Sequence, residues 1–118
     1  MYVDDDEASK SLVGIIIEDM GCGLVIASDG IEAIEKMQTE AFDLVLMDIR
    51  MPRMNGYEAS RRIRRINKEI PIVALTADIM EWVPQQCWDA GMNGFVTKPI
   101  NIDEFKSIIK NYLGYRKH

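Results

Sequence analysis

Short runs of apolar residues alternate along the chain with segments whose apolar positions recur every three or four residues. Continuous apolar runs of this length predict strands buried on both faces, whereas a spacing of three or four residues predicts amphipathic helices. We expect five strands, at residues 1–3, 24–28, 42–49, 71–77 and 95–97. We expect five helices after them in turn, at residues 7–20, 31–40, 57–67, 82–89 and 101–113.

This alternation predicts the α/β class, with a parallel sheet between two layers of helices, because right-handed crossovers carry the chain from each strand to the next. A chain of 118 residues suits one domain, and no linker or repeat divides it. We therefore expect one domain over residues 1–118, with a frayed tail at residues 114–118. The first strand is expected to be truncated, since only three residues precede the first aspartate.

Charge and cysteine content restrict the class of partner and the compartment. A net charge of −5 argues against binding to nucleic acid or to an anionic membrane, and the run of arginines at 61–65 is interpreted as a solvated helix face. The acidic start "MYVDDDE" does not resemble a secretory signal, and no apolar stretch is long enough to span a bilayer. Cys22 and Cys87 are interpreted as reduced thiols, so we expect a cytoplasmic protein.

Polar residues follow the expected strands at their carboxyl ends, where parallel α/β sheets hold ligands. Clustered carboxylates repel one another, and a hard cation such as Mg²⁺ relieves that repulsion. A lysine nearby adds positive charge where a phosphoryl oxygen would lie. The set therefore predicts Mg²⁺-dependent phosphoryl chemistry with a carboxylate nucleophile, for which Asp48 is the best candidate. The residues concerned are Asp4, Asp5, Asp6, Asp48, Thr76 and Lys98.

Each of these residues also has a plainer interpretation. The aspartates at 4–6 could be a solvated acidic start, and Thr76 could be an ordinary hydroxyl at a strand end. After Asp48 the chain must turn sharply, and Asn55 and Gly56 are expected to supply backbone with positive φ for that turn. Only the occurrence of all these residues at one edge of the sheet favours the functional interpretation.

Four segments in a fixed order carry a family resemblance. They are "VDDDE" at 3–7, "LVLMDIRMPRMNG" at 44–56, "PIVALTA" at 71–77 and "AGMNGFVTKPI" at 90–100. With them the chain resembles a response-regulator receiver domain of two-component signalling, and most resembles the receivers of hybrid sensor histidine kinases. The resemblance implies a flavodoxin-like fold, with a five-stranded parallel sheet in the order 2-1-3-4-5 flanked by five helices.

The same resemblance implies a role for each matching residue. Asp48 matches the phosphoacceptor. Asp4 and Asp5 match the acidic pair that binds Mg²⁺ or Mn²⁺, with Asp5 as a direct ligand and Asp4 acting through water. Arg50 would offer its backbone carbonyl to the same cation.

Three more residues match the part of the family site that binds and senses the phosphoryl group. Thr76 matches the switch hydroxyl, and Phe95 matches the switch aromatic. Lys98 matches the lysine that binds phosphate, and its bond to Pro99 is expected to be cis.

The implied function is to accept a phosphoryl group from a phosphohistidine onto Asp48. The donor would be a histidine kinase or a histidine phosphotransfer domain. Phosphorylation would change the shape of the face formed by residues 82–89, 95–97 and 101–113. The same face could also form a homodimer. Such a domain is a signalling module and not an enzyme. It would nevertheless catalyse its own phosphorylation and a slow dephosphorylation, tuned by Arg50 and Asp78.

Two rival functions use similar elements. A phosphohydrolase of the haloacid-dehalogenase type also has a strand-end aspartate and Mg²⁺, but it needs a second acid where Arg50 stands. A flavin-binding module of the same sheet order needs a Ser/Thr/Gly-rich loop after the first strand. Here that loop reads "DDDEAS", which would repel phosphate.

Overall fold

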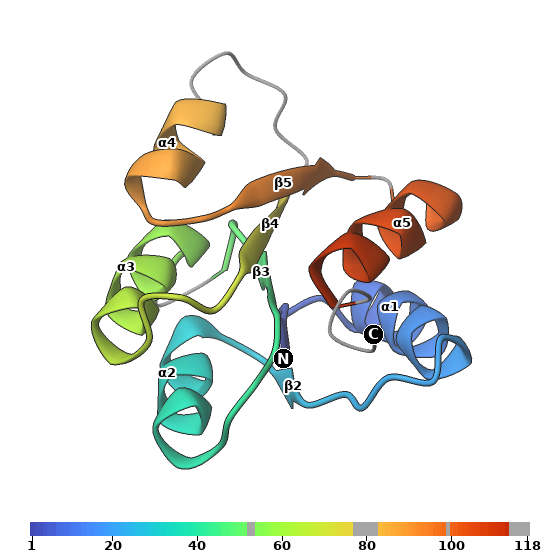
Figure 1. Ribbon diagram of the computed structural model, residues 1–118, viewed down its shortest axis with the longest axis horizontal. Coiled ribbons are helices and arrows are strands. Elements are labelled where there is room, and N and C mark those ends of the chain that lie inside the picture. The colour runs from blue at the N-terminus through green and yellow to red at the C-terminus, as the bar shows by residue number, and fades with distance from the viewer. Residues whose placement is uncertain (52–53, 77–82, 99, 114–118) are drawn as a thin grey trace.

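The computed structural model describes residues 1–51, 54–76, 83–98 and 100–113 (Figure 1). Its centre is one five-stranded sheet in the order β2-β1-β3-β4-β5, with every neighbouring pair parallel. The predicted fold class and strand order are therefore confirmed. The strands are β1 (Tyr2–Val3), β2 (Ile26–Ala27), β3 (Val45–Asp48), β4 (Ile72–Thr76) and β5 (Gly94–Thr97).

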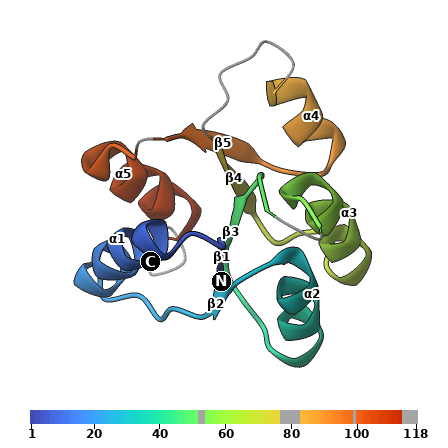
Figure 2. The same ribbon diagram turned by 180° about the vertical axis from the view of Figure 1, so that it is seen from behind.

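Five helices connect and cover the strands. Helices α1 and α5 pack on one face of the sheet, and α2, α3 and α4 lie on the other, as Figures 1 and 2 show from opposite sides. No described helix has the length and apolar character needed to cross a membrane. The helices are α1 (Glu7–Asp19), α2 (Gly30–Thr39), α3 (Gly56–Ile66), α4 (Val83–Asp89) and α5 (Ile102–Leu113).

Side-chain caps begin the helices next to the carboxyl ends of the strands. Asp6 begins α1 by accepting a hydrogen bond from the Ser9 N–H, and Asn55 begins α3 by accepting one from the Glu58 N–H. The Asp6 carboxylate also accepts from the Ser9 hydroxyl at 2.7 Å. The sequence grouped Asp6 with the acidic site residues, and its role is instead to cap α1.

Two apolar layers, one on each face of the sheet, form the core. Tyr2, Leu46 and Phe105 belong to the layer beneath α1 and α5, and Val3 and Met47 belong to the layer beneath α2 and α3. Neighbouring residues of β1 and β3 therefore point to opposite faces, as the pleat of a strand requires. This alternation decides which polar side chains meet at the end of the sheet.

The strands at the β2 edge are shorter than predicted. Residues 24–28 were expected to form a strand, but β2 contains only Ile26–Ala27. Its neighbour β1 begins at Tyr2, whose N–H donates to the Val25 carbonyl at 2.9 Å. Because β2 pairs only with β1, a two-residue β1 limits the length of the ladder on both strands.

Candidate functional site

The strand register brings Asp4 and Asp48 side by side. Tyr2 pairs with Leu46 and Val3 pairs with Met47, so the residue that follows on each strand lies at the same level. Both aspartates are buried, and Asp4 has no exposed surface. Carboxylate oxygens of Asp4, Asp5 and Asp48 all lie within 4.8 Å of one another. Three of the predicted acidic residues therefore form one cluster.

Lys98 reaches this cluster from the end of β5. Its Nζ lies 3.4 Å from Asp4 Oδ2 and 3.4 Å from Asp48 Oδ1, so one ammonium bridges the two buried carboxylates. The Lys98 backbone N–H donates to the Thr76 carbonyl at 2.7 Å, which continues the β4–β5 pairing by one residue. The sheet thus positions the lysine that the sequence predicted.

Asp4 and Asp5 differ in their hydrogen bonds. Asp4 Oδ2 accepts from the Tyr2 hydroxyl at 2.5 Å, and Asp4 Oδ1 accepts from the Asp6 N–H at 2.9 Å. Asp5 is exposed, and within the described part of the chain its carboxylate accepts no hydrogen bond. Asp5 is therefore the member of the cluster whose oxygens are open to an incoming ligand.

Burial sets the protonation behaviour of Asp48. Burial first, and the neighbouring Asp4 carboxylate second, raise the pKa of Asp48 to about 7, although Lys98 acts in the opposite direction. Burial and the hydrogen bond to Asp4 likewise raise the pKa of Tyr2. Two carboxylates this close compete for one ammonium, so the cluster keeps an excess of negative charge at neutral pH.

The cluster has the chemistry of a site for a hard divalent cation. Its donors are all carboxylate oxygens from Asp4, Asp5 and Asp48, which Mg²⁺ prefers to nitrogen or sulfur. One donor is exposed and two are buried, so a cation could keep water on its open side. The donor set of this chain therefore fits Mg²⁺.

The remaining predicted residues surround the cluster. Thr76 ends β4, is buried and pairs with Thr97 of β5. Phe95 lies on the edge strand β5, paired with Ala74, and is 40% exposed. Arg50 is an exposed residue beyond β3. Pro99, whose bond to Lys98 is expected to be cis, and Asp78 lie outside the described residues.

The turn after β3 depends on glycine for space and not for an unusual backbone angle. The expected positive φ at Asn55 and Gly56 is wrong: Asn55 has φ −73°, and the described glycines with positive φ are Gly21 and Gly91. The Gly56 N–H instead donates to the Ile49 carbonyl at 2.8 Å. A Cβ on Gly56 would come within 2.4 Å of the Asp48 carbonyl oxygen, so α3 starts directly against the end of β3.

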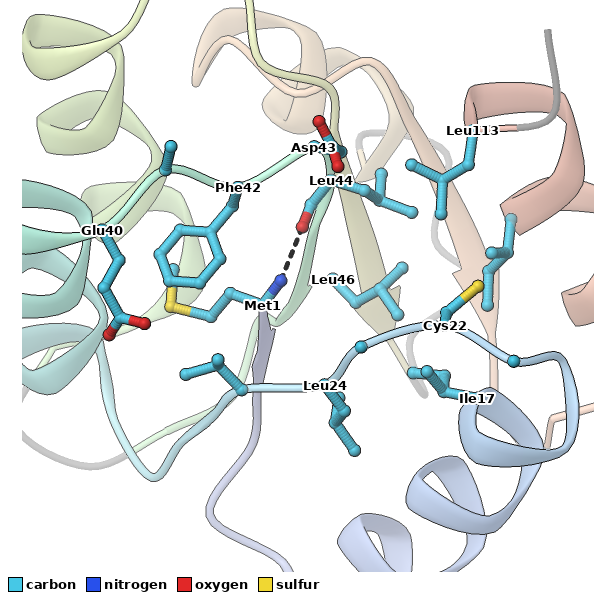
Figure 3. Close-up of a pocket in the computed structure, with 15 residues that line it drawn as sticks. Met1, Ile17, Cys22, Leu24, Glu40, Phe42, Asp43, Leu44, Leu46 and Leu113 are labelled. Carbon is cyan, nitrogen blue, oxygen red and sulfur yellow. Dashed lines mark hydrogen bonds between the residues drawn. The ribbon is translucent and has the colours of Figure 1, made fainter. Parts of the chain in front are cut away.

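A cavity of about 680 Å³ lies at the opposite end of the sheet (Figure 3). Its walls are largely apolar and include Ile17, Leu24 and Leu46. The amino group of Met1 donates to the Leu44 carbonyl at 2.7 Å inside it. The sequence indicated the short first strand but not this cavity, nor the hydrogen bond from Tyr2 to Asp4.

Comparison with known proteins identifies the family. The family model of the response regulator receiver domain matches residues 1–110. The chain belongs to this family. It is 39% identical to the sensor protein GacS of Pseudomonas syringae pv. syringae over 97% of this chain, and it is 30% identical to the sensor histidine kinase RcsC of Escherichia coli K12 over 95%. It spans 13% and 12% of the length of those two relatives.

Solved receiver structures agree over the whole fold. The receiver domain of sensor histidine kinase PA1611 from Pseudomonas aeruginosa PAO1, with magnesium in its active-site cleft, is 30% identical. Its TM-score is 0.88, over 96% of this chain and 94% of that one. Chemotaxis protein CheY4 of Vibrio cholerae gives a TM-score of 0.89 at 30% identity, over 95% of each chain. The chain is thus a phosphoacceptor receiver domain of two-component signalling.

Proposed function

We propose that Asp48 is the phosphoacceptor of this receiver domain. The observation that carries the proposal is the position of its carboxylate, which ends β3 beside Asp4 and 3.4 Å from the Lys98 ammonium. A carboxylate can form an acyl phosphate, and a nearby cation offsets the charge of the incoming phosphoryl group. The haloacid-dehalogenase alternative gains no support, because an exposed Arg50 stands where a second acid is needed.

The acidic cluster divides into direct and indirect ligands for Mg²⁺. Asp5 and Asp48 would bind the cation directly, together with the Arg50 backbone carbonyl. Asp4 would act through water, which is supported by the protein donors that already occupy both of its oxygens. When bound, the cation neutralises charge that develops on the phosphoryl oxygens. Mn²⁺ is expected to bind in place of Mg²⁺ when it is supplied instead, because it also prefers carboxylate and water ligands.

Lys98 and Thr76 would bind the phosphoryl oxygens once Asp48 is modified. The phosphoryl group adds charge and acceptor oxygens, which an ammonium and a hydroxyl can pair with. Thr76 would move toward the phosphoryl group, and the half-exposed Phe95 would turn inward. The face formed by α4, β5 and α5 would then change its shape, as a shift between two populated states.

The phosphoryl donor would be a phosphohistidine on a histidine kinase or a histidine phosphotransfer domain. The chain has one histidine, His118, far in sequence from Asp48. Residues 1–118 would act as a single receiver domain, by analogy with relatives in which it is one part of a longer kinase. A homodimer would use the α4-β5-α5 face. The net charge of −5 does not favour nucleic acid as a direct partner.

Intact mass spectrometry tests this function. The wild-type protein is incubated with acetyl phosphate, with Mg²⁺ or with EDTA, beside Asp48→Asn and Asp6→Asn. Wild type should gain one phosphoryl group, and only with Mg²⁺. Asp6→Asn should behave in the same way, because Asp6 caps α1 and is not part of the cluster. Asp48→Asn should gain none. A phosphoryl group on Asp48→Asn, or one gained by wild type in EDTA, would contradict the assignment. Slow loss of the group in buffer would measure the self-dephosphorylation.

A further inference from the structure

Tyr2 connects the buried core to the acidic cluster. Its ring is fully buried in the apolar layer beneath α1 and α5. Because Tyr2 and Asp4 are two residues apart on the extended chain, both side chains point to the same face of the sheet. The Tyr2 hydroxyl donates to Asp4 Oδ2 at 2.5 Å. A phenol in an apolar core thus finds its hydrogen-bond partner in the site itself.

Three donors hold the Asp4 carboxylate from three directions. Tyr2 approaches from the core, the Asp6 N–H approaches from the loop after β1, and the Lys98 ammonium approaches from the end of β5. The Tyr2 contact is the shortest of the three, and a hydroxyl that donates to a carboxylate forms a strong, short hydrogen bond. Asp4 also shares Lys98 with Asp48, so its orientation influences the charge beside the phosphoacceptor.

We propose that Tyr2 is a positioning residue of the phosphoacceptor site, which fixes the Asp4 carboxylate for divalent-cation binding by hydrogen-bonding it from the core. The inference rests on the proposed function, in which the cluster binds Mg²⁺. A phenylalanine would fill almost the same volume, so the hydroxyl, and not the packing of the ring, carries the role. Tyr2 would act on the cation through Asp4 and its water, and outer partners that orient a metal site typically change metal affinity by about 10-fold to 100-fold.

The variant Tyr2→Phe tests the inference, with Tyr112→Phe as the matched control. Tyr112 also loses only a hydroxyl, whose long 3.4 Å contact is to the Asn93 carbonyl before β5. Isothermal titration calorimetry of Mg²⁺ binding should show roughly 10-fold weaker affinity for Tyr2→Phe. Tyr112→Phe should bind as wild type does, and thermal melts would verify that both variants are folded.

A spectroscopic measurement covers the case in which Tyr2→Phe does not fold. Wild-type protein with ¹³Cζ-labelled tyrosine is titrated with Mg²⁺, and three tyrosine signals are assigned from phenylalanine variants at positions 57, 112 and 115. The remaining signal, that of Tyr2, should shift with the same midpoint as the calorimetric titration. An unmoved Tyr2 signal would overturn the inference.

The outcomes separate this inference from the function on which it rests. If Tyr2→Phe binds Mg²⁺ as tightly as wild type does, Tyr2 has no positioning role, and the proposed function stands. If the wild-type protein itself binds no Mg²⁺, the proposed function fails and the inference fails with it. Weaker binding in Tyr2→Phe alone, with normal binding in Tyr112→Phe, supports both.

Discussion

The two ends of the sheet each bury an ionisable group, and they do so with opposite results. At the carboxyl end, burial helps to raise the pKa of Asp48 to about 7. At the amino end, burial lowers the pKa of the Met1 amino group to about 6, although Asp43 and Glu40 act in the opposite direction. In both places burial is the largest cause, and it disfavours the charged form.

The two ends differ in the residues that surround each ionisable group. Asp48 stands among two further carboxylates and one ammonium, so negative charge is in excess and a cation is favoured. Met1 donates to the uncharged Leu44 carbonyl, and apolar residues form most of the cavity wall, which also includes Asp43 and Glu40. We conclude that burial at the carboxyl end serves a binding site, whereas burial at the amino end places an amino group in a largely apolar cavity.

The largest expected effect comes from removing the cation of the carboxyl end. Lys98→Ala leaves two buried carboxylates without their ammonium, and loss of one partner of a buried ion pair costs about 4 kcal/mol. The free energy of unfolding, measured with urea at pH 8 in EDTA, should fall by about that amount. Lys106→Ala removes an exposed ion pair with Asp19 and should cost less than about 0.5 kcal/mol. Equal losses would contradict the comparison.

Glycines at the two ends should differ next. Gly56→Ala at the carboxyl end forces a Cβ against the Asp48 carbonyl, and overpacking against backbone should cost about 3 kcal/mol. Gly23→Ala at the cavity meets no atom within 4 Å, so its free energy of unfolding should stay within about 0.5 kcal/mol of wild type. Chemical denaturation of both variants measures the difference. A near-neutral Gly56→Ala would mean that α3 does not start against β3.

Stability against pH should follow Asp48. Its folded pKa of about 7 exceeds the ordinary 3.8, so between these values the folded state holds the proton more tightly than the unfolded state does. Stability is therefore lost as the pH rises. Between pH 5 and 7 in EDTA, wild type should lose about 2 kcal/mol more than Asp48→Asn, at about 1.4 kcal/mol per unit. Saturating Mg²⁺ should remove the loss. If the stabilities of wild type and Asp48→Asn changed in parallel with pH, this expectation would be contradicted.

The amino end should show a pH effect of similar size, with the opposite sign. The folded amine has a pKa of about 6 against an ordinary 8.0, so stability is gained as the pH rises through this range. Acetylation of Met1 removes the charge and keeps the N–H that donates to Leu44, and the cavity has room for the acetyl group. Thermal melts should show a gain at pH 5.5 that exceeds the gain at pH 8.5 by about 2 kcal/mol, because the folded and ordinary pKa values differ by about two units. A gain that does not depend on pH would exclude desolvation as its cause.

The sequence predicted the main residues of the site better than the contacts among them. Asp48 and Lys98 could be assigned because the ends of parallel strands meet at one edge of a sheet. Asp6 was grouped wrongly, because a carboxylate that caps a helix and one that binds a cation look alike until the helix start is known. The Tyr2 contact had a signal, a phenol two residues before an aspartate on one strand, but the depth of burial decides whether the two meet.

The amino end was harder to predict. The sequence indicated a short first strand, but a cavity depends on how Leu24, Leu46 and Ile17 pack around the gap. The turn after β3 was predicted at the correct place for the wrong reason. A turn can require glycine because φ is positive or because another part of the backbone approaches closely. Only the distance from Gly56 to the Asp48 carbonyl distinguishes these two reasons.

The most direct test of the central claim locates the phosphoryl group among three neighbouring carboxylates. After incubation with acetyl phosphate and Mg²⁺, the protein is reduced with borohydride, which converts an aspartyl phosphate to an alcohol, and its peptides are sequenced by tandem mass spectrometry. The alcohol should be found at Asp48 alone, since Asp48 ends β3 beside the Lys98 ammonium. An alcohol at Asp4 or Asp5, with Asp48 unmodified, would contradict the assignment of the phosphoacceptor.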